Sequence, residues 1–98
     1  MDYKIIWSDA AIADLQSICS YIARDNPEAA ERIGNGILDH VLILASFPYI
    51  GPAYPRGAVG PLREIVFRPY RIFYDVSEEA RRVDILHVWH GARNEPGF

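Results

Sequence analysis

The fold is decided by residues 61–93, PLREIVFRPYRIFYDVSEEARRVDILHVWHGAR. Three runs in this stretch are rich in β-branched and aromatic residues, which predicts three β-strands: Leu62–Phe67, Tyr70–Val76 and Val83–Trp89. Pro69 separates the first two runs and cannot donate a ladder hydrogen bond, so we expect it at a turn or an edge. The polar segment 77–82 is typical of a hairpin loop. Together these runs predict a three-stranded antiparallel meander.

The residues ahead of the meander predict one strand and two helices. The side chains of Tyr3–Trp7 alternate in the way typical of a short strand. A lone strand is not stable, so we expect this strand to pair with the last strand of the meander. Ser8 is a candidate N-cap for a helix that runs to about Arg24. Asn26 and Pro27 begin a second amphipathic helix. The predicted class is α+β with the order β-α-α-β-β-β: a helical hairpin packs on a small twisted antiparallel sheet, and its other face remains a shallow concave surface.

Length and composition favour one domain over residues 1–98, with enough apolar residues for a compact core. Cys19 is the only cysteine, so an intramolecular disulfide and a cysteine-based zinc site are both excluded. The longest apolar run, residues 41–45, is too short to cross a bilayer, and the chain opens without a signal-peptide pattern. We expect a cytoplasmic protein that does not contact membranes and needs no cofactor.

The net charge of −3 is unevenly distributed along the chain. Residues 1–50 carry three basic side chains against seven acidic ones, whereas residues 51–98 carry seven arginines against six acidic residues. Arginine presents a planar fork that suits carboxylates and phosphates, so a local anion site in the second half is reasonable. A general nucleic-acid-binding protein would be more basic overall.

Two segments break the regular pattern. Gly34 and Gly36 lie inside the second helix, where each costs about 1 kcal/mol relative to alanine. Either close packing against the first helix or local weakness explains them. The segment 47–60 contains three prolines and three glycines, which predicts a long loop, with Tyr49, Ile50 and Tyr54 as candidates to pack it down.

His87 and His90 are the candidate proton-transfer residues of the last strand, because histidine titrates near neutral pH. They are three apart on a predicted strand, so their side chains point to opposite faces and at most one lines the concave surface. A structural role is the better interpretation for His87, and for His90 structural and functional roles are evenly balanced. No third ligand is spaced near them, so we expect no metal site.

The ordered pattern of the chain resembles the RelE/ParE superfamily of toxins from type II toxin–antitoxin modules. The motifs that carry the resemblance are spread along nearly the whole chain: Ala10-Ala11, Asp14-Leu15, Ile18, Tyr21-Ile22, Asn26-Pro27, Ala29-Ala30, Phe47-Pro48 with Gly51, Tyr70-Arg71-Ile72-x-Tyr74-x-Val76, and Ile85-Leu86-x-Val88-x-His90-x-x-Arg93. The superfamily has the same β-α-α-β-β-β order. The resemblance implies a growth-inhibiting toxin of the kind found in plasmid-stabilization modules, neutralised by a cognate antitoxin, in a heterotetramer or larger complex.

One branch of the superfamily cuts mRNA on the ribosome, and the resemblance gives Arg71 and His90 the catalytic positions if this chain belongs there. In that branch the 2′-hydroxyl attacks the adjacent phosphodiester, which needs a cation on the phosphate oxygens and a group that moves a proton. Arg71 matches the arginine that faces the scissile phosphate. The simpler interpretation is a solvated arginine or an ion pair with Asp75 or Glu64.

The other branch poisons DNA gyrase by binding, and the sequence favours this branch. Lys4 is the only lysine, the basic cluster of the cutting branch is missing, and the overall charge is acidic. Candidate contacts to antitoxin or target are Arg63, Arg71, Tyr74 and Arg93, although Tyr74 also suits core packing. Trp7 and Trp89 are either core aromatics between the first and last strands or outer-face anchors. A non-toxic binding module on the same scaffold is a third interpretation.

Overall fold

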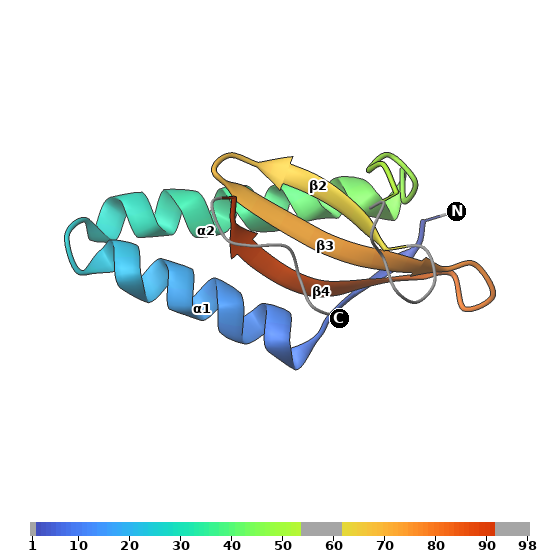
Figure 1. Ribbon diagram of the computed structural model, residues 1–98, viewed down its shortest axis with the longest axis horizontal. Coiled ribbons are helices and arrows are strands. Elements are labelled where there is room, and N and C mark those ends of the chain that lie inside the picture. Colours follow the sequence, from blue (N-terminus) through green and yellow to red (C-terminus); the bar gives the residue numbers. More distant parts are fainter. Residues whose placement is uncertain (1, 54–61, 92–98) are drawn as a thin grey trace.

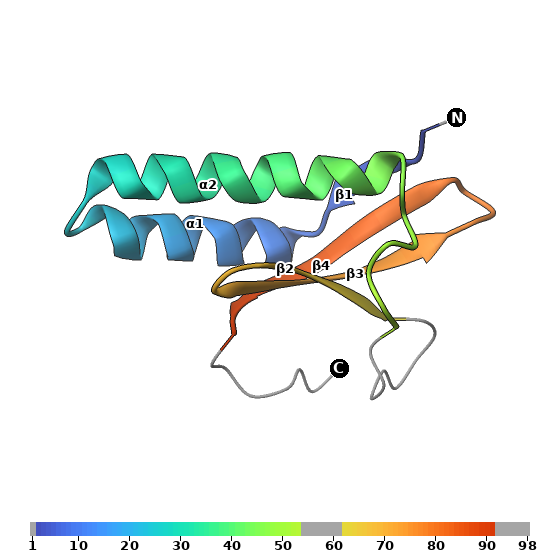
Figure 2. The ribbon, with the colours of Figure 1, turned by 90° about the horizontal axis from the view of Figure 1, so that it is seen from above.

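The computed structural model describes residues 2–53 and 62–91, and it contains the predicted elements in the predicted order. Their bounds are β1 Lys4–Trp7, α1 Asp9–Ala23, α2 Pro27–Leu42, a 3₁₀ turn Ile43–Ala45, β2 Arg63–Phe67, β3 Tyr70–Ser77 and β4 Arg82–His90. The sheet and the helical hairpin form two layers, with both helices on one face of the sheet (Figures 1 and 2). The α+β class and the helical hairpin are therefore confirmed.

The sheet has the strand order β1-β4-β3-β2, so the meander and the place of β1 beside the last strand are confirmed. The pairing of β1 with β4 is parallel, from Lys4 opposite Arg82 to Trp7 opposite Ile85. The sheet is therefore mixed, and the expectation of an antiparallel sheet throughout was wrong at this strand. Tight turns impose antiparallel pairing only on consecutive strands, and β1 is joined to the meander through the two helices.

Side-chain caps fix the start of each helix. The Ser8 hydroxyl accepts a hydrogen bond from the Ala11 amide at 3.0 Å and donates one to the Leu86 carbonyl at 3.0 Å. The Asn26 side chain accepts from the Ala29 amide at 3.0 Å. Each cap satisfies an amide that the helix leaves without an internal partner. The Ser8 cap also joins α1 to the middle of β4, so one residue fixes the helix and its position on the sheet.

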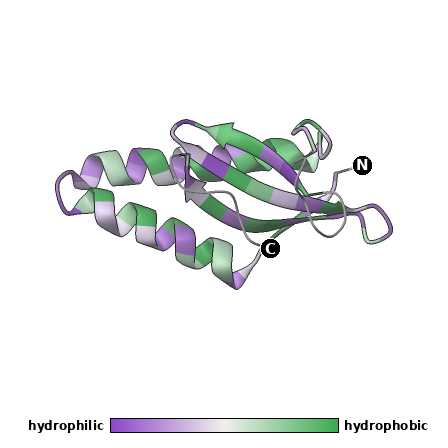
Figure 3. Ribbon diagram, in the orientation of Figure 1, coloured by the Kyte–Doolittle hydropathy of each residue, from purple (hydrophilic) through white to green (hydrophobic). Residues whose placement is uncertain are grey.

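The core lies between the helices and the sheet. Its fully or almost fully buried side chains are Ala11, Ile37, Val41, Leu44, Ile72, Tyr74, Val83, Ile85 and Val88. Figure 3 shows that hydrophobic and hydrophilic residues alternate along the helices and strands, as expected for elements that bury one side. Burial of each large aliphatic side chain contributes roughly 1.5–3 kcal/mol, so this layer supplies most of the stability.

A β-bulge interrupts the pairing of β3 with β4. Tyr74 is opposite Ile85 and Phe73 is opposite His87, so Leu86 is an extra residue in β4. Ile85 is buried under the helices before the bulge, and Val88 is buried there after it. The bulge therefore reverses which residues of β4 face the helices, as expected for a one-residue insertion.

The two glycines of α2 lie at close contacts, which decides between the alternatives left open by the sequence. A Cβ at Gly34 would lie 3.0 Å from Cys19 Sγ of α1, as expected for close helix packing. A Cβ at Gly36 would instead overlap the ring of Phe67, with 3.1 Å to Cε1. Gly34 thus brings the two helices together, and Gly36 lets β2 pack against α2.

Candidate functional site

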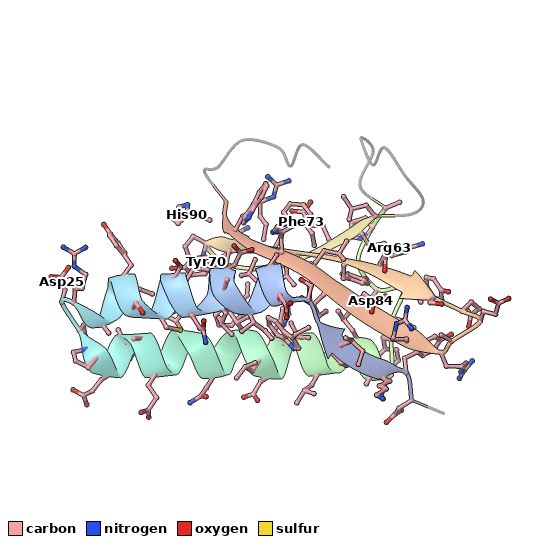
Figure 4. The ribbon with its side chains drawn as sticks, turned by 90° about the horizontal axis from the view of Figure 1, so that it is seen from below. Asp25, Arg63, Tyr70, Phe73, Asp84 and His90 are labelled. Carbon is pink, nitrogen blue, oxygen red and sulfur yellow. The ribbon has the colours of Figure 1, made fainter. Side chains whose placement is uncertain are left out.

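The candidate site lies on the sheet face turned away from the helices, which we call the outer face. Cross-strand pairing places Arg71 opposite Trp89 and Phe73 opposite His87 on this face. The Arg71 guanidinium lies 5.1 Å from the centre of the Phe73 ring, and the Phe73 and Trp89 ring centres are 5.9 Å apart. Figure 4 shows Phe73 on the outer face and Tyr70 between the sheet and the helices. A cation, two aromatic rings and an imidazole are therefore grouped together.

Arg71 is held by Glu64 from the neighbouring strand. Its Nε donates to Glu64 Oε2 at 2.7 Å, and its Nη2 donates to Glu64 Oε1 at 3.3 Å. Both side chains are about one-fifth exposed, at 21% and 19%. Of the two ion pairs considered from the sequence, the one with Glu64 forms. Two parallel hydrogen bonds to one carboxylate fix the orientation of the guanidinium.

His87 is fixed by a carboxylate from the first helix. Its Nδ1 lies 3.0 Å from Asp14 Oδ2, which also accepts the Val88 amide at 3.0 Å. The imidazole centre is 5.0 Å from the Trp89 ring centre. The side-chain exposures are 25% for His87 and 21% for Asp14. Asp14 thus binds the β4 backbone just after the bulge and orients the imidazole on the outer face.

His90 lies on the opposite face from His87, so the predicted division between the two histidines is confirmed. It is paired with Tyr70, and the two rings meet edge to face at 5.7 Å. A shallow hollow of about 390 Å³ lies between the end of β4 and α1, with His90, Tyr70 and Tyr21 in its lining. The structure therefore brings Arg71 together with His87 and leaves His90 next to α1.

Arg63 and Tyr74 both hold the loop that follows the 3₁₀ turn. The Arg63 guanidinium donates to the Gly51 carbonyl at 2.6 Å and stacks over Tyr49 at 4.9 Å. Tyr74 is fully buried, and its hydroxyl accepts the Gly51 amide at 3.0 Å. A direct contact of Tyr74 with a partner would therefore require this loop to open. Arg93, the fourth predicted contact, lies outside the described residues.

Of the side chains expected to pack this loop down, the two that lie in the described residues stay largely exposed. Tyr49 is 46% exposed and Ile50 is 60% exposed, whereas Pro48 and Gly51 are buried; Tyr54 lies outside the described residues. Tyr49 and Tyr3 both donate hydrogen bonds to Glu78 in the turn before β4. The bond to Glu78 raises the pKa of Tyr49 to about 12, and the two tyrosines lower the pKa of Glu78.

An apolar cleft of about 450 Å³ lies between this loop, α2 and β2. Its lining includes Ile43, Ile50 and Ile65. Val66, at its rim, is 49% exposed. The Glu64 amide points away from β3 and donates to the Pro52 carbonyl. Val66 is two residues further along the strand, so its amide and carbonyl also point away from β3. Its amide and carbonyl have no backbone partner within the described part of the chain. The cleft therefore borders an unpaired strand edge.

A second pair of acidic side chains lies farther along the outer face. Asp75 and Asp84 are opposite each other on β3 and β4, and Asp84 forms an ion pair with Arg82 at 2.9 Å. Burial, followed by the charge of Asp84, raises the pKa of Asp75. In residues 2–53 and 62–91 no group of three or more metal-ligating side chains occurs. Within the same ranges no helix is long and apolar enough to span a membrane.

Comparison with known proteins gives the family. The family described as the ParE toxin of the type II toxin–antitoxin system parDE matches residues 5–95. The chain belongs to the ParE toxin family. Toxin RelE2 of Caulobacter vibrioides is 35% identical over 91 residues, covering 92% of this chain and 97% of the relative. The protein Y4kP of Sinorhizobium fredii is 36% identical over 95 residues, covering 95% of this chain and 93% of the relative.

Solved structures of related systems share the fold of this ParE-family chain. The chromosomal ParDE system of P. aeruginosa matches with a TM-score of 0.74 and 23% identity, covering 90% of this chain and 95% of that chain. The RelBE2 toxin–antitoxin complex of Mycobacterium tuberculosis matches with a TM-score of 0.71 and 22% identity, covering 95% of each. This ParE-family protein is thus the toxin component of a type II toxin–antitoxin system, with a cognate antitoxin as its partner.

The sequence missed three features of the site. Asp14 looked like one polar residue of an amphipathic helix, and only the packing of α1 beside β4 brings it to His87. Trp89 was expected first in the core between the first and last strands, but it lies on the outer face opposite Arg71, beyond the end of β1. Arg63 was expected as a partner contact or a solvated charge, and its hydrogen bond to the loop was not foreseen. Each of these depends on contacts between distant segments.

Proposed function

We propose that this toxin arrests growth by binding DNA gyrase in the cytoplasm, and not by cutting RNA. The observation that carries the proposal is the two-bond ion pair between Arg71 and Glu64. An RNA-cutting toxin needs cations that stabilise the charge on the scissile phosphate. Glu64 neutralises the arginine in that position, and a bound phosphate would have to compete with this carboxylate. Lys4 is the only lysine, and the net charge is −3, which also opposes an approach to RNA phosphates.

Supercoiling of relaxed plasmid by purified gyrase tests the proposal. The toxin is expected to inhibit the reaction, and an equimolar amount of its antitoxin is expected to restore it. Arg71→Ala should weaken inhibition several-fold, because Arg71 is the outer-face cation expected to contact the target. Undiminished supercoiling at a large molar excess of toxin, with a well-folded sample, would contradict gyrase as the target.

A second candidate function is ribosome-dependent cleavage of mRNA. It is supported by one observation: His87, oriented by Asp14, lies on the same face as Arg71. A cation and a proton-transferring group are the two components that this reaction needs. Sequencing of RNA 5′ ends after toxin induction distinguishes the two candidates. Cuts at fixed codon positions, lost in Arg71→Ala, together with unaffected supercoiling, would make RNA cleavage the activity of this toxin in place of gyrase binding.

We further propose that an apolar antitoxin segment binds in the cleft beside β2 and pairs with the strand at Val66. An extended segment can add to an open edge through main-chain hydrogen bonds and place alternate side chains in a neighbouring pocket. Val66→Pro removes the outward amide while keeping an edge-strand residue, whereas Val66→Thr keeps the amide. Loss of one such bond, worth about 1 kcal/mol, lowers affinity roughly fivefold.

Isothermal titration with both variants measures this difference. Equal antitoxin affinity for Val66→Pro and Val66→Thr would exclude strand addition at this position. We expect the complex to be a heterotetramer or larger, which light scattering on the purified complex measures directly.

A further inference from the structure

The apolar cleft beside β2 contains one polar side chain with unused hydrogen-bonding capacity, His40 in the last turn of α2. Apart from His40 and Glu64, the side chains that line the cleft are apolar. The imidazole of His40 is half-buried, and its ring centre lies 5.8 Å from that of Phe67. Within residues 2–53 and 62–91 it forms no hydrogen bond or ion pair. Its two ring nitrogens are therefore left for solvent or for a partner.

The groups that face His40 offer no free counter-charge in the described part of the chain. From β2, Glu64 lines the same cleft, but both of its carboxylate oxygens accept hydrogen bonds from Arg71. The loop contributes residues 50–52, none of which titrates, and the 3₁₀ turn contributes only aliphatic side chains. On α2 itself the neighbouring acid, Asp39, is exposed to solvent. A ligand that removes water from the cleft would leave an imidazolium there without a free carboxylate of the toxin to pair with.

We propose that His40 makes the binding of antitoxin in this cleft depend on pH, because the complex accepts the neutral imidazole and rejects the imidazolium. This dependence rests on the proposed antitoxin site beside β2 and names how that site is regulated. An apolar segment packed against Ile43, Ile50 and Ile65 would shield His40 from water. Burying an unpaired charge is costly, so a protonated His40 must lose its proton when the segment binds. The neutral ring keeps one donor and one acceptor, which main-chain groups of the segment can satisfy.

The direction of the effect follows from the number of protons bound. The complex binds fewer protons than the free toxin does, so affinity falls as the pH falls. Histidine in water is half-protonated near pH 6.5. A cleft that accepts only the neutral form therefore raises the dissociation constant by up to about tenfold between pH 7.5 and pH 5.5. It also releases about half a proton per complex at pH 6.5, and acidification of the cell would free toxin from the antitoxin.

Titration calorimetry measures this proton release directly. The full-length toxin is mixed at pH 6.5 with the cognate antitoxin, purified from the co-expressed complex, in two buffers that differ in ionisation enthalpy. The difference in heat gives the number of protons released by the wild type, without any variant. His40→Gln keeps a hydrogen-bonding amide, and His40→Phe keeps a ring against Phe67, but neither side chain titrates. In both variants we expect about half a proton less to be released and the affinity to change less between pH 5.5 and pH 7.5.

His90→Gln is the matched control, because His90 lies next to α1 and does not line this cleft. It should keep the proton release and the pH dependence of the wild type. Equal proton release in the wild type and both His40 variants overturns the proposal. Proton uptake that is lost in His40→Gln also overturns it, because the antitoxin would then supply a carboxylate to the imidazolium. A pH dependence lost in His90→Gln and kept in His40→Gln assigns the effect to the wrong histidine and has the same consequence.

The two Val66 variants separate this proposal from the antitoxin site on which it rests. Weaker binding of Val66→Pro than of Val66→Thr, together with proton release that does not depend on His40, leaves strand addition standing and overturns the role of His40. Equal affinity of the two Val66 variants, with no effect of His40→Gln at any pH, overturns both.

Discussion

Replacing Tyr74 by phenylalanine removes one oxygen atom from the core and leaves the Gly51 amide without its acceptor. The hydroxyl of Tyr74 accepts this amide at 3.0 Å, and both residues are buried. The aromatic ring stays in place, so hydrophobic burial is nearly unchanged. What is lost is the hydrogen bond itself, and the amide left behind is shielded from water.

The expected cost is about 1–2 kcal/mol, the range for a buried donor that loses its partner. For a domain of about 100 residues, a change of this size lowers the melting temperature by roughly 5–15 °C. Thermal and urea unfolding followed by circular dichroism measure it. Loosening of the loop also disturbs the cleft, because Gly51 contributes to its lining, so antitoxin affinity should fall as well.

Tyr70→Phe is the matched control. Tyr70 is on the same strand and is also buried, but its hydroxyl makes no hydrogen bond to any residue in the ranges 2–53 and 62–91. Burial raises the pKa of Tyr70 without a compensating partner, so this substitution should be neutral or slightly stabilising. If Tyr74→Phe proves as stable as Tyr70→Phe, the loop is not held by the Tyr74 hydroxyl and the reasoning is refuted.

Two further predictions concern stability. Gly36→Ala should destabilise the protein by about 1 kcal/mol, because the overlap of the new methyl group with Phe67 outweighs the gain in helix propensity. Asn35→Ala, on the exposed side of α2, gains the same kind of propensity without an overlap and should stabilise the protein. The midpoints of urea unfolding of the two variants measure this difference. The pKa of Asp75 is raised in the folded protein, so the protonated carboxyl contributes to folding stability at acidic pH, and this contribution is lost as the pH rises through the raised pKa. Asp75→Asn should therefore raise stability at pH 7 by no more than about 0.5 kcal/mol and make stability depend less on pH in the acidic range. Melting temperatures measured from pH 3 to pH 7 test both effects.

Local patterns in the sequence predicted the elements well, because each was specified by neighbouring residues. The caps at Ser8 and Asn26, the helical hairpin and the three strands after Pro61 all follow from spacing and side-chain type. The parallel direction of β1 did not follow, because strand direction across a long connection depends on the path of the whole chain.

The site was predicted only in part, because its geometry depends on one inserted residue. Alternation along an uninterrupted strand groups Ile85 with His87 on one face. The bulge at Leu86 separates them, so Ile85 is buried under the helices, while His87 lies on the outer face with its Nδ1 next to Asp14 of α1. Arg71 could be identified from its motif, and its ion pair with Glu64 was one of two that the sequence offered. The contact from Asp14 could not be found without the packing of α1 beside β4.

The bulge also decides how the end of β4 would respond to a change in chain length. Deleting Leu86 would restore regular pairing and leave the later side chains on their present faces, because Val88 would still be opposite Ile72 and Trp89 opposite Arg71. A regular strand that kept Leu86 would instead turn Trp89 towards the helices and Val88 away from them. One residue can therefore be removed at this position without altering the surface formed by the residues that follow it.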